Sequence, residues 1–128
     1  MNQKYPHKEK LKSRKLIEKI FAEGKSVSQF PLKMVYLPVE LNSDSPLQVG
    51  VSAPKRKFKN AVTRNRIKRL MRESYRLNKH LIFNNLPTSY ACMILYIGKE
   101  EPDFGALQIT TQKLFTKFLE KEKSDQPG

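Results

Sequence analysis

The sequence predicts an α/β fold in one domain that spans residues 1–128. Stretches with apolar residues at helical spacing alternate with short apolar stretches typical of strands. A chain of 128 residues with 38% apolar and 29% charged content can bury one modest core, as a globular protein does. We therefore expect helices packed on a β-sheet, with residues 1–10 and 123–128 flexible at the two ends.

The first helix is predicted from Ser13 to about Glu23. Ser13 is a favourable N-cap, and Gly24 is placed where it can end the helix. Four apolar residues at helical spacing would form its buried face: Leu16, Ile17, Ile20 and Phe21.

Two strands are predicted after this helix. Residues 31–39 form the first, with prolines near both ends that suggest strand ends or a sheet edge. Its alternation puts three side chains on one side: Leu32, Met34 and Tyr36. The turn cluster at 42–46 predicts that residues 47–53 return as the antiparallel partner of a hairpin. Gly50 within that second strand indicates either a bulge or a close approach of another group.

A long helix is predicted from about Asn60 to His80. On a helical wheel, the apolar side carries Thr63, Ile67, Leu70, Met71, Ser74, Leu77 and Leu81. The opposite side carries Asn65, Lys68, Arg69, Arg72, Arg76 and Lys79, with Arg64 and Arg66 at the boundaries. This pattern predicts a helix that is anchored by one face and presents cations on the other.

The rest of the chain is predicted to form one strand and one helix. Tyr90 to Ile97 is a nearly continuous apolar run, as expected of a strand at the centre of a sheet. Asp103 can cap the last helix. The core face of that helix would carry Phe104, Leu107, Thr111, Leu114 and Phe118.

The positive charge is concentrated in residues 55–79. This segment holds eleven of the 25 basic residues and a single acid, Glu73, in a chain of net charge +13. Solvated helix faces usually mix charges of both signs, and charge this dense repels itself unless a polyanion is bound. Nucleic acid is therefore the favoured partner. An anionic membrane surface is the alternative, but the apolar face of this helix is needed for packing on the sheet.

Several other classes of protein are disfavoured. A single cysteine, Cys92, excludes a disulfide within the chain, and with only two separated histidines it also excludes a structural zinc site. Cys92 lies in the apolar run and is interpreted as inert core. No signal peptide or apolar stretch of spanning length is visible, so we expect a cytoplasmic protein.

A catalytic site within the protein is also disfavoured. Protein nucleases use clustered carboxylates for metal ions or a positioned acid and base, whereas the aspartates here are scattered at positions 44, 103 and 125. Glu73 is interpreted as a salt-bridge partner of Arg69 or Arg76. We therefore predict no catalytic residue and no metal bound by the protein alone.

The tripeptide Arg64-Asn65-Arg66 lies in the first turns of the basic helix, where guanidinium groups can bind phosphate oxygens in pairs. In its context, VGVSAPKRKFKNAVTRNRIKRLMRESYR, it closely resembles the protein subunit of bacterial ribonuclease P, of which this tripeptide is the namesake motif. The run Phe21-Ala22-Glu23-Gly24 is similar to the N-terminal signature of that family. The resemblance covers most of the chain and is most specific in this central motif.

The resemblance implies a two-layer α+β sandwich like that of some ribosomal proteins. It would have three helices and a mixed sheet of about four strands with a left-handed βαβ crossover, an exception to the usual hand. It also implies an accessory subunit of an endoribonuclease that removes the 5′ leader of precursor tRNA. The catalyst is then the RNA subunit, which requires Mg²⁺. The implied partners are that RNA and precursor tRNA, with no membrane and no obligatory protein partner.

The resemblance also assigns roles to single residues. The residues implied to bind the catalytic RNA are Arg64, Asn65, Arg66, Lys68, Arg69, Arg72 and Arg76. Those implied to lie in or beside the leader cleft are Phe21, Lys55, Arg56, Ile17, Lys33 and Tyr36. Ile17 and Lys33 stand where relatives carry aromatic residues, which indicates fewer stacking contacts and more phosphate attraction. Core packing remains the alternative role for Phe21.

Two other classes of function remain to be weighed. One is a ribosomal or other structural RNA-binding protein without a role in cleavage. The other is a DNA-binding helix-turn-helix regulator, which the predicted strands before the basic helix disfavour because they leave no place for the first helix of that motif.

Overall fold

A four-stranded mixed β-sheet forms the centre of the computed structural model, which describes residues 9–41 and 45–125. The strand order is β1-β2-β4-β3, in which β2 is antiparallel to β1 and β4, and β3 is parallel to β4. The strands are β1 Lys25–Gln29, β2 Leu32–Pro38, β3 Leu47–Ser52 and β4 Tyr90–Tyr96. The predicted central position of the Tyr90 strand is confirmed, because β4 lies between β2 and β3.

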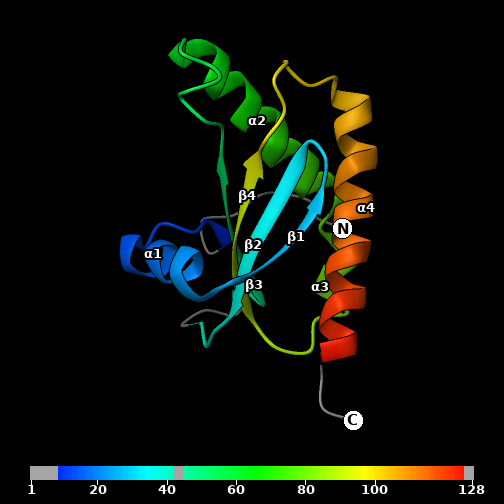
Figure 1. Ribbon diagram of the computed structural model, residues 1–128. Helices are drawn as coiled ribbons and strands as arrows, with labels where there is room; N and C mark the ends of the chain where they lie inside the picture. The colour runs from blue at the N-terminus through cyan, green and yellow to red at the C-terminus, as the bar shows by residue number, and fades with distance from the viewer. Residues whose placement is uncertain (1–8, 42–44, 126–128) are drawn as a thin grey trace.

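Helices lie on both faces of this sheet (Figure 1). They are α1 Arg14–Glu23, α2 Ala61–Asn78, the short α3 His80–Phe83 and α4 Phe104–Asp125. Figure 1 shows α1 on one side of the sheet and α4 on the other, and α2 and α4 pack together over that second face. The predicted α+β class with a mixed sheet is therefore confirmed.

The strands supply side chains to two separate cores. Tyr36 and Cys92 face α2 and α4 and belong to the larger core. Val35 and Met93, each one residue along its strand, face the other way and pack with Ile20 of α1. Cys92 is fully buried, and this burial raises the pKa of its thiol, so its interpretation as inert core is confirmed.

The predicted hairpin between residues 31–39 and 47–53 is wrong. Strand β2 instead pairs with β1, whose residues 25–29 the sequence reasoning did not recognise as a strand, and with β4. β1 is a polar edge strand in which Val27 alone is apolar, so its sequence carries little strand signal. Strand β3 pairs in parallel with β4 because α2 carries the chain across the sheet between them.

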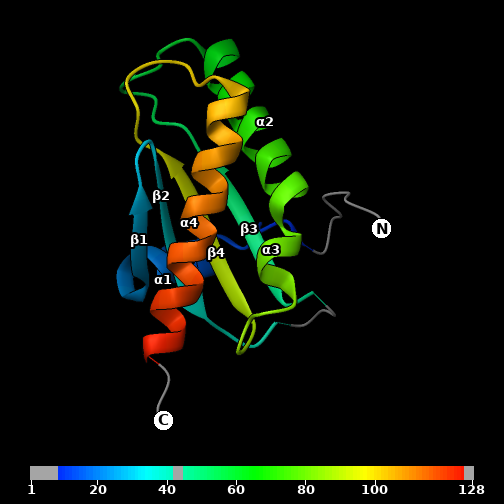
Figure 2. The same cartoon turned by 90° about the vertical axis from the view of Figure 1, so that its right-hand side faces the viewer.

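This β3-α2-β4 connection has the left-handed sense. In Figure 2, α2 lies in front of the sheet and the chain passes from β3 on the right to β4 on its left. Right-handed connections are strongly preferred in βαβ units. The unusual hand puts α2 beside the edge strand β3, with its basic side at the border of the fold.

The role of Gly50 is now defined as close packing. The register through Val49, Gly50 and Val51 against β4 is continuous, so no bulge is present. A Cβ atom at position 50 would lie 2.5 Å from the Sδ atom of Met93. Glycine thus leaves room for Met93 on the face of the sheet that α1 partly covers.

The predicted helix starts are confirmed by their capping bonds. The backbone N–H of Leu16 donates to Ser13 Oγ at 3.2 Å, and that of Val62 donates to the Asn60 side chain at 2.8 Å. Asp103 caps α4 in the same way, accepting from the N–H of Ala106 at 3.0 Å.

The two chain ends differ from the flexible segments that the sequence predicts. α4 continues to Asp125, so residues 123–125 are helical, and residues 126–128 lie outside the described range. At the other end, Glu9 is buried and Lys10 forms a β-bridge with Val49. Residues 1–8 of the predicted flexible segment also lie outside the described range.

Candidate nucleic-acid interface

The amphipathic pattern of α2 sets the orientation of its basic side. Ile67 and Met71 are buried against the larger core, as predicted. Ser74 is also buried and donates a 2.8 Å hydrogen bond to the Thr111 hydroxyl of α4. With this side fixed, three residues of the opposite side are exposed: Asn65, Arg69 and Arg72.

Part of the basic side is electrostatically uncompensated. Within the described part of the chain, Lys68, Arg69 and Arg72 have neither a hydrogen bond nor an ion pair through their side chains. Neighbouring cations without acidic partners repel one another and create a strong positive potential. The surface of α2 is therefore suited to a phosphate-bearing partner.

Arg64 has a local structural role. Its Nη1 atom donates to the carbonyl oxygens of Phe58 at 2.8 Å and Lys59 at 3.0 Å. These bonds join the first turn of α2 to the segment that precedes it. A guanidinium group has five N–H donors, so Arg64 keeps further N–H groups that can donate to a ligand.

Two further arginines form ion pairs at the surface. Arg66 lies 3.3 Å from Glu101, and both side chains are largely exposed. Exposed pairs of this kind contribute at most about 1 kcal/mol, so a phosphate can replace Glu101 at low cost. Arg76 pairs with Glu73, which confirms one of the two predicted partners. The hydrogen bond from Arg76 lowers the pKa of Glu73, although desolvation acts in the opposite direction.

The prediction that Lys79 belongs to the exposed basic side is wrong. Lys79 is only 9% exposed, and its Nζ atom donates to the Glu9 carboxylate at 3.0 and 3.1 Å. The Nζ atom of Lys79 also lies over the aromatic ring of Phe83, 5.4 Å from the ring centroid. The partner lies seventy residues away in sequence, so helical periodicity alone could not identify this burial.

A cleft of about 260 Å³ lies beside α2 where the N-terminal segment, α1, β3 and β4 meet. The lining residues are Lys10, Leu11, Lys12, Ile17, Val49, Gly50, Val51, Arg72 and Met93. Arg72 belongs to the basic side of α2 and also lines this cleft, so the two surfaces are continuous. Lys10 to Lys12 were not predicted to be part of a site, because a short basic segment near the chain end carries no distinctive signal.

The residues predicted to line the leader cleft have different positions. Ile17 lines the cleft. Phe21, one turn further along α1, is 51% exposed and lies outside both cores, so core packing does not account for it. Lys33 is half-buried on β2, opposite Leu95 of β4, which belongs to the core on the α1 side of the sheet.

The prediction that Tyr36 lies beside the cleft is wrong. Tyr36 is fully buried on the other face of the sheet, where its hydroxyl donates to Glu122 of α4 at 2.9 Å. Strand alternation explains this position, because Tyr36 shares its side of β2 with Met34, which belongs to the same core.

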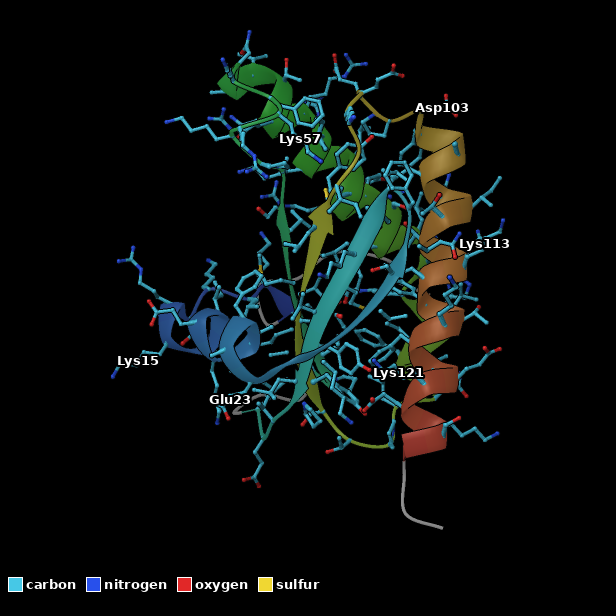
Figure 3. All side chains as sticks on the ribbon, viewed as in Figure 1. Lys15, Glu23, Lys57, Asp103, Lys113 and Lys121 are labelled. Atoms are coloured by element: carbon cyan, nitrogen blue, oxygen red, sulfur yellow. The ribbon has the colours of Figure 1, made fainter. Side chains whose placement is uncertain are left out.

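Lys55 and Arg56 are exposed in the turn that follows β3. They lie at the same end of the sheet as the start of α2, beyond the cleft lining. The neighbouring Lys57 instead donates to the carbonyl oxygen of Ile97 at 2.8 Å and joins this turn to the loop after β4 (Figure 3).

The described residues include no group of three or more His, Cys, Asp or Glu side chains arranged to hold a metal ion. The side chains of the described residues therefore do not form a donor set that suits a Mg²⁺ ion. Among the described helices, none has the length and apolar character needed to cross a bilayer.

The fold and the surface together define an α+β protein that presents a cationic helix beside a cleft, as an RNA-binding protein does. A family model described as ribonuclease P matches residues 5–119. The chain therefore belongs to the ribonuclease P protein family and is a protein component of that endoribonuclease. This assignment decides against the helix-turn-helix regulator and the ribosomal protein.

Two relatives illustrate the similarity in sequence. The chain is 39% identical over 108 residues to the ribonuclease P protein component of Porphyromonas gingivalis, covering 82% of this chain and 79% of that protein. It is 34% identical over 118 residues to the corresponding protein of Caldanaerobacter subterraneus subsp. tengcongensis, covering 89% and 95%.

Solved structures show the same fold. The RNase P protein of Staphylococcus aureus matches with a TM-score of 0.68 at 18% identity, covering 86% of this chain and 94% of that one. The RNase P protein of Thermotoga maritima matches with a TM-score of 0.67 at 24% identity, covering 85% and 96%.

Proposed function

We propose that α2 binds the catalytic RNA of ribonuclease P and that the adjoining cleft binds the single-stranded 5′ leader of precursor tRNA. The supporting observation is the continuity of the two surfaces. Lys68, Arg69 and Arg72 have no acidic partner in the described part of the chain, and Arg72 also borders the cleft. One protein can then contact the folded RNA and the substrate leader together.

The two surfaces suit different forms of RNA. A stiff helix with spaced cations complements the phosphate backbone of a folded RNA, where binding depends on charge and shape. A narrow cleft with cations at its border and apolar side chains in its lining instead suits an unpaired strand, whose bases are free to contact those side chains.

Several side chains are proposed to contact the leader. Ile17 lines the cleft, and the exposed ring of Phe21 is available for stacking on a base. Lys33, Lys55 and Arg56 are proposed to attract its phosphates. Stacking of a base on an aromatic side chain is worth about 1–3 kcal/mol.

In this proposal the protein supplies binding and the RNA supplies catalysis. The Mg²⁺ ions needed for cleavage would be held by the RNA-containing holoenzyme, with no metal ligand from this chain. The protein would promote the endonucleolytic step by holding the leader close to the RNA active site and by reducing phosphate repulsion between the two RNAs.

Reconstitution tests this function. We expect the protein, combined with a ribonuclease P RNA at low magnesium concentration, to restore cleavage of precursor tRNA at the 5′ end of the mature sequence. The protein alone should cleave no RNA. Failure to stimulate the RNA, or cleavage by the protein alone, would contradict the proposed division of roles.

Phe21→Ala tests the leader contact separately. Loss of one stacking interaction should lower the affinity gained from a long leader by about fivefold or more, and should leave the affinity for leaderless tRNA unchanged. Phe30→Ala is the matched control, because Phe30 is 70% exposed in the turn between β1 and β2. An unchanged dependence on leader length in the Phe21 variant would show that Phe21 does not contact the leader.

A further inference from the structure

The segment Glu9–Lys12, here called the strap, is attached to the edge of the sheet. Lys10 forms a parallel β-bridge with Val49, and the backbone N–H of Leu11 donates to the Val49 carbonyl at 3.1 Å. The Leu11 side chain is buried and packs in the core between α1 and the sheet. The bridge to Val49 and the burial of Leu11 therefore attach the strap to β3.

Glu9 holds the start of the strap against α2. It is only 2% exposed, and its Oε1 atom accepts a 2.7 Å hydrogen bond from the Tyr75 hydroxyl. Both of its carboxylate oxygens also accept from Lys79 Nζ, at 3.0 and 3.1 Å. A buried carboxylate is stable only when it is paired and hydrogen-bonded, so Glu9 and Lys79 each need the other in place.

The strap brings its two lysines to the cleft. Burial alternates along it, so Glu9 and Leu11 are buried whereas Lys10 and Lys12 are exposed and line the cleft. Arg72 lines the same cleft from α2. Three cations from two separate segments thus border one groove whose lining includes the apolar side chains of Ile17 and Met93.

We propose that the strap is a phosphate-binding wall of the leader cleft, in which Lys10 and Lys12 act together with Arg72, and that Glu9 is the positioning residue that holds this wall. The proposal rests on the proposed binding of the leader in this cleft and adds residues outside the predicted set. The ligand is the phosphate backbone of a single-stranded RNA. Because Tyr75 and Lys79 are at the C-terminal end of α2, the strap also ties one wall of the cleft to the helix that would bind the catalytic RNA.

Glu9→Gln tests the positioning role in the reconstituted holoenzyme. The readout is the leader factor, defined as the affinity for precursor tRNA with a long leader divided by the affinity for leaderless tRNA. We expect Glu9→Gln to reduce the leader factor at least threefold, while affinity for the catalytic RNA stays within about twofold. A general loss of stability would lower both affinities together and leave their ratio unchanged.

Glu122→Gln is the matched control. Glu122 is also 2% exposed and also accepts hydrogen bonds from tyrosine hydroxyls, but neither it nor its partners Tyr36 and Tyr90 line the cleft or touch the strap. It should lower the melting temperature as Glu9→Gln does and leave the leader factor unchanged. An equal reduction of the leader factor by both variants would show that the effect does not depend on the position of Glu9 at the strap, and the inference would fail.

The double variant Lys10→Gln/Lys12→Gln tests the strap without altering a buried group. The double variant should reduce the leader factor by at least as much as Glu9→Gln does. Adding Glu9→Gln to the double variant should reduce the leader factor little further, because Glu9, Lys10 and Lys12 act through one segment. If the wild-type protein gives no leader factor, the proposed function is wrong. If the wild-type factor is present and the double variant keeps it, the strap inference is wrong.

Discussion

Buried polar side chains in the described part of the chain are held by hydrogen bonds to specific partners. Glu122 accepts hydrogen bonds from the hydroxyls of Tyr36 at 2.9 Å and Tyr90 at 2.6 Å, and Lys25 lies 3.7 Å away. No buried side-chain nitrogen or oxygen in the described ranges lacks a hydrogen-bond partner. Since an unsatisfied buried polar group costs roughly 1–3 kcal/mol, these bonds fix α4 to the sheet in one arrangement.

The bond between Tyr90 and Glu122 predicts a loss of stability at high pH. Burial, followed by the hydrogen bond and charge of Glu122, raises the pKa of Tyr90 above its ordinary value of 10.0. A raised pKa means that the unfolded chain releases this proton first, so its contribution is present below pH 10 and falls as pH rises further. We expect the free energy of unfolding to decrease by up to about 1.4 kcal/mol per pH unit more in the wild type than in Tyr90→Phe. Denaturant titrations from pH 8 to 11 measure this difference, and parallel curves for the two proteins would contradict it.

Gly24 predicts a second effect of a single residue. Its φ of −73° is ordinary for any amino acid, so backbone conformation does not require glycine here. Glycine is needed instead because there is no room for a side chain. A Cβ atom at this position would lie 2.4 Å from the Ile20 carbonyl oxygen and 2.8 Å from that of Tyr36, both of which are backbone atoms. We expect Gly24→Ala to destabilise the protein by about 2 kcal/mol through this overpacking.

Gly105 provides the matched control for that substitution. It lies in the first turn of α4, and the nearest atom to an added Cβ is Asp103 Oδ2 at 3.4 Å. Alanine is the better helix former, so Gly105→Ala should be neutral or stabilise the protein by up to about 1 kcal/mol. Equal thermal or urea unfolding of the two variants would mean that the close approach at Gly24 relaxes without cost.

At the scale of elements, the helices could be predicted far better than the sheet. A period of 3.6 residues places Arg69 opposite Ile67 and Met71 whatever the rest of the fold is, and the local caps Ser13, Asn60 and Asp103 fix where helices begin. Strand pairing depends on contacts between distant segments. The local sequence of β3 does not show whether it pairs with β2 in a hairpin or with β4 after the connection through α2. The predicted pairing of β3 with β2 was therefore wrong.

The candidate site follows the same division. The cationic side of α2 could be predicted because both its charge and its periodicity lie in one continuous segment. The cleft was implied only by the family resemblance, which included Ile17; no local pattern predicts it, because its lining comes from the strap, α1, β3, α2 and β4. Lys79 shows where helical periodicity fails as a predictor of exposure. The helical wheel places it on the exposed side, but it is buried in an ion pair with the distant Glu9.

The basic side of α2 predicts a defined salt dependence. Each cation that contacts a phosphate releases about one counterion, so Arg69→Ala should reduce the slope of log affinity against log salt concentration by about one. Lys113→Ala is the control, because this exposed lysine of α4 points away from the sheet on the side opposite α1 (Figure 3). Filter binding of the catalytic RNA at several salt concentrations measures both slopes. A slope that Arg69→Ala leaves unchanged would mean that Arg69 does not face the RNA.

At the scale of the whole molecule, charge and stability oppose each other. The net charge is +13, and the segment 55–79 holds most of the excess. The apolar side of α2 must be buried for the core to form, and this burial holds the cationic side rigid at the surface. The fold therefore includes a built-in electrostatic cost that a bound polyanion removes, and folding and RNA binding should stabilise each other.

This coupling predicts that small anions stabilise the free protein. Sulfate should bind the folded state at Lys68, Arg69 and Arg72 on the basic side of α2, and the resulting stabilisation grows as RT ln(1 + [L]/Kd). A gain of 1 kcal/mol corresponds to roughly 4 °C in a domain of this size. We therefore expect the melting temperature to rise by several degrees in tens of millimolar sulfate relative to chloride at equal ionic strength.

Sulfate also strengthens apolar burial in any protein because it is excluded from the protein surface, so the comparison must include the double variant Arg69→Gln/Arg72→Gln. The double variant should melt higher in chloride than the wild type, because repulsion is relieved, and should gain less from sulfate. If sulfate raises the melting temperatures of the two proteins equally, its effect is the general one of exclusion from the protein surface. The basic side would then impose no electrostatic cost that anions relieve.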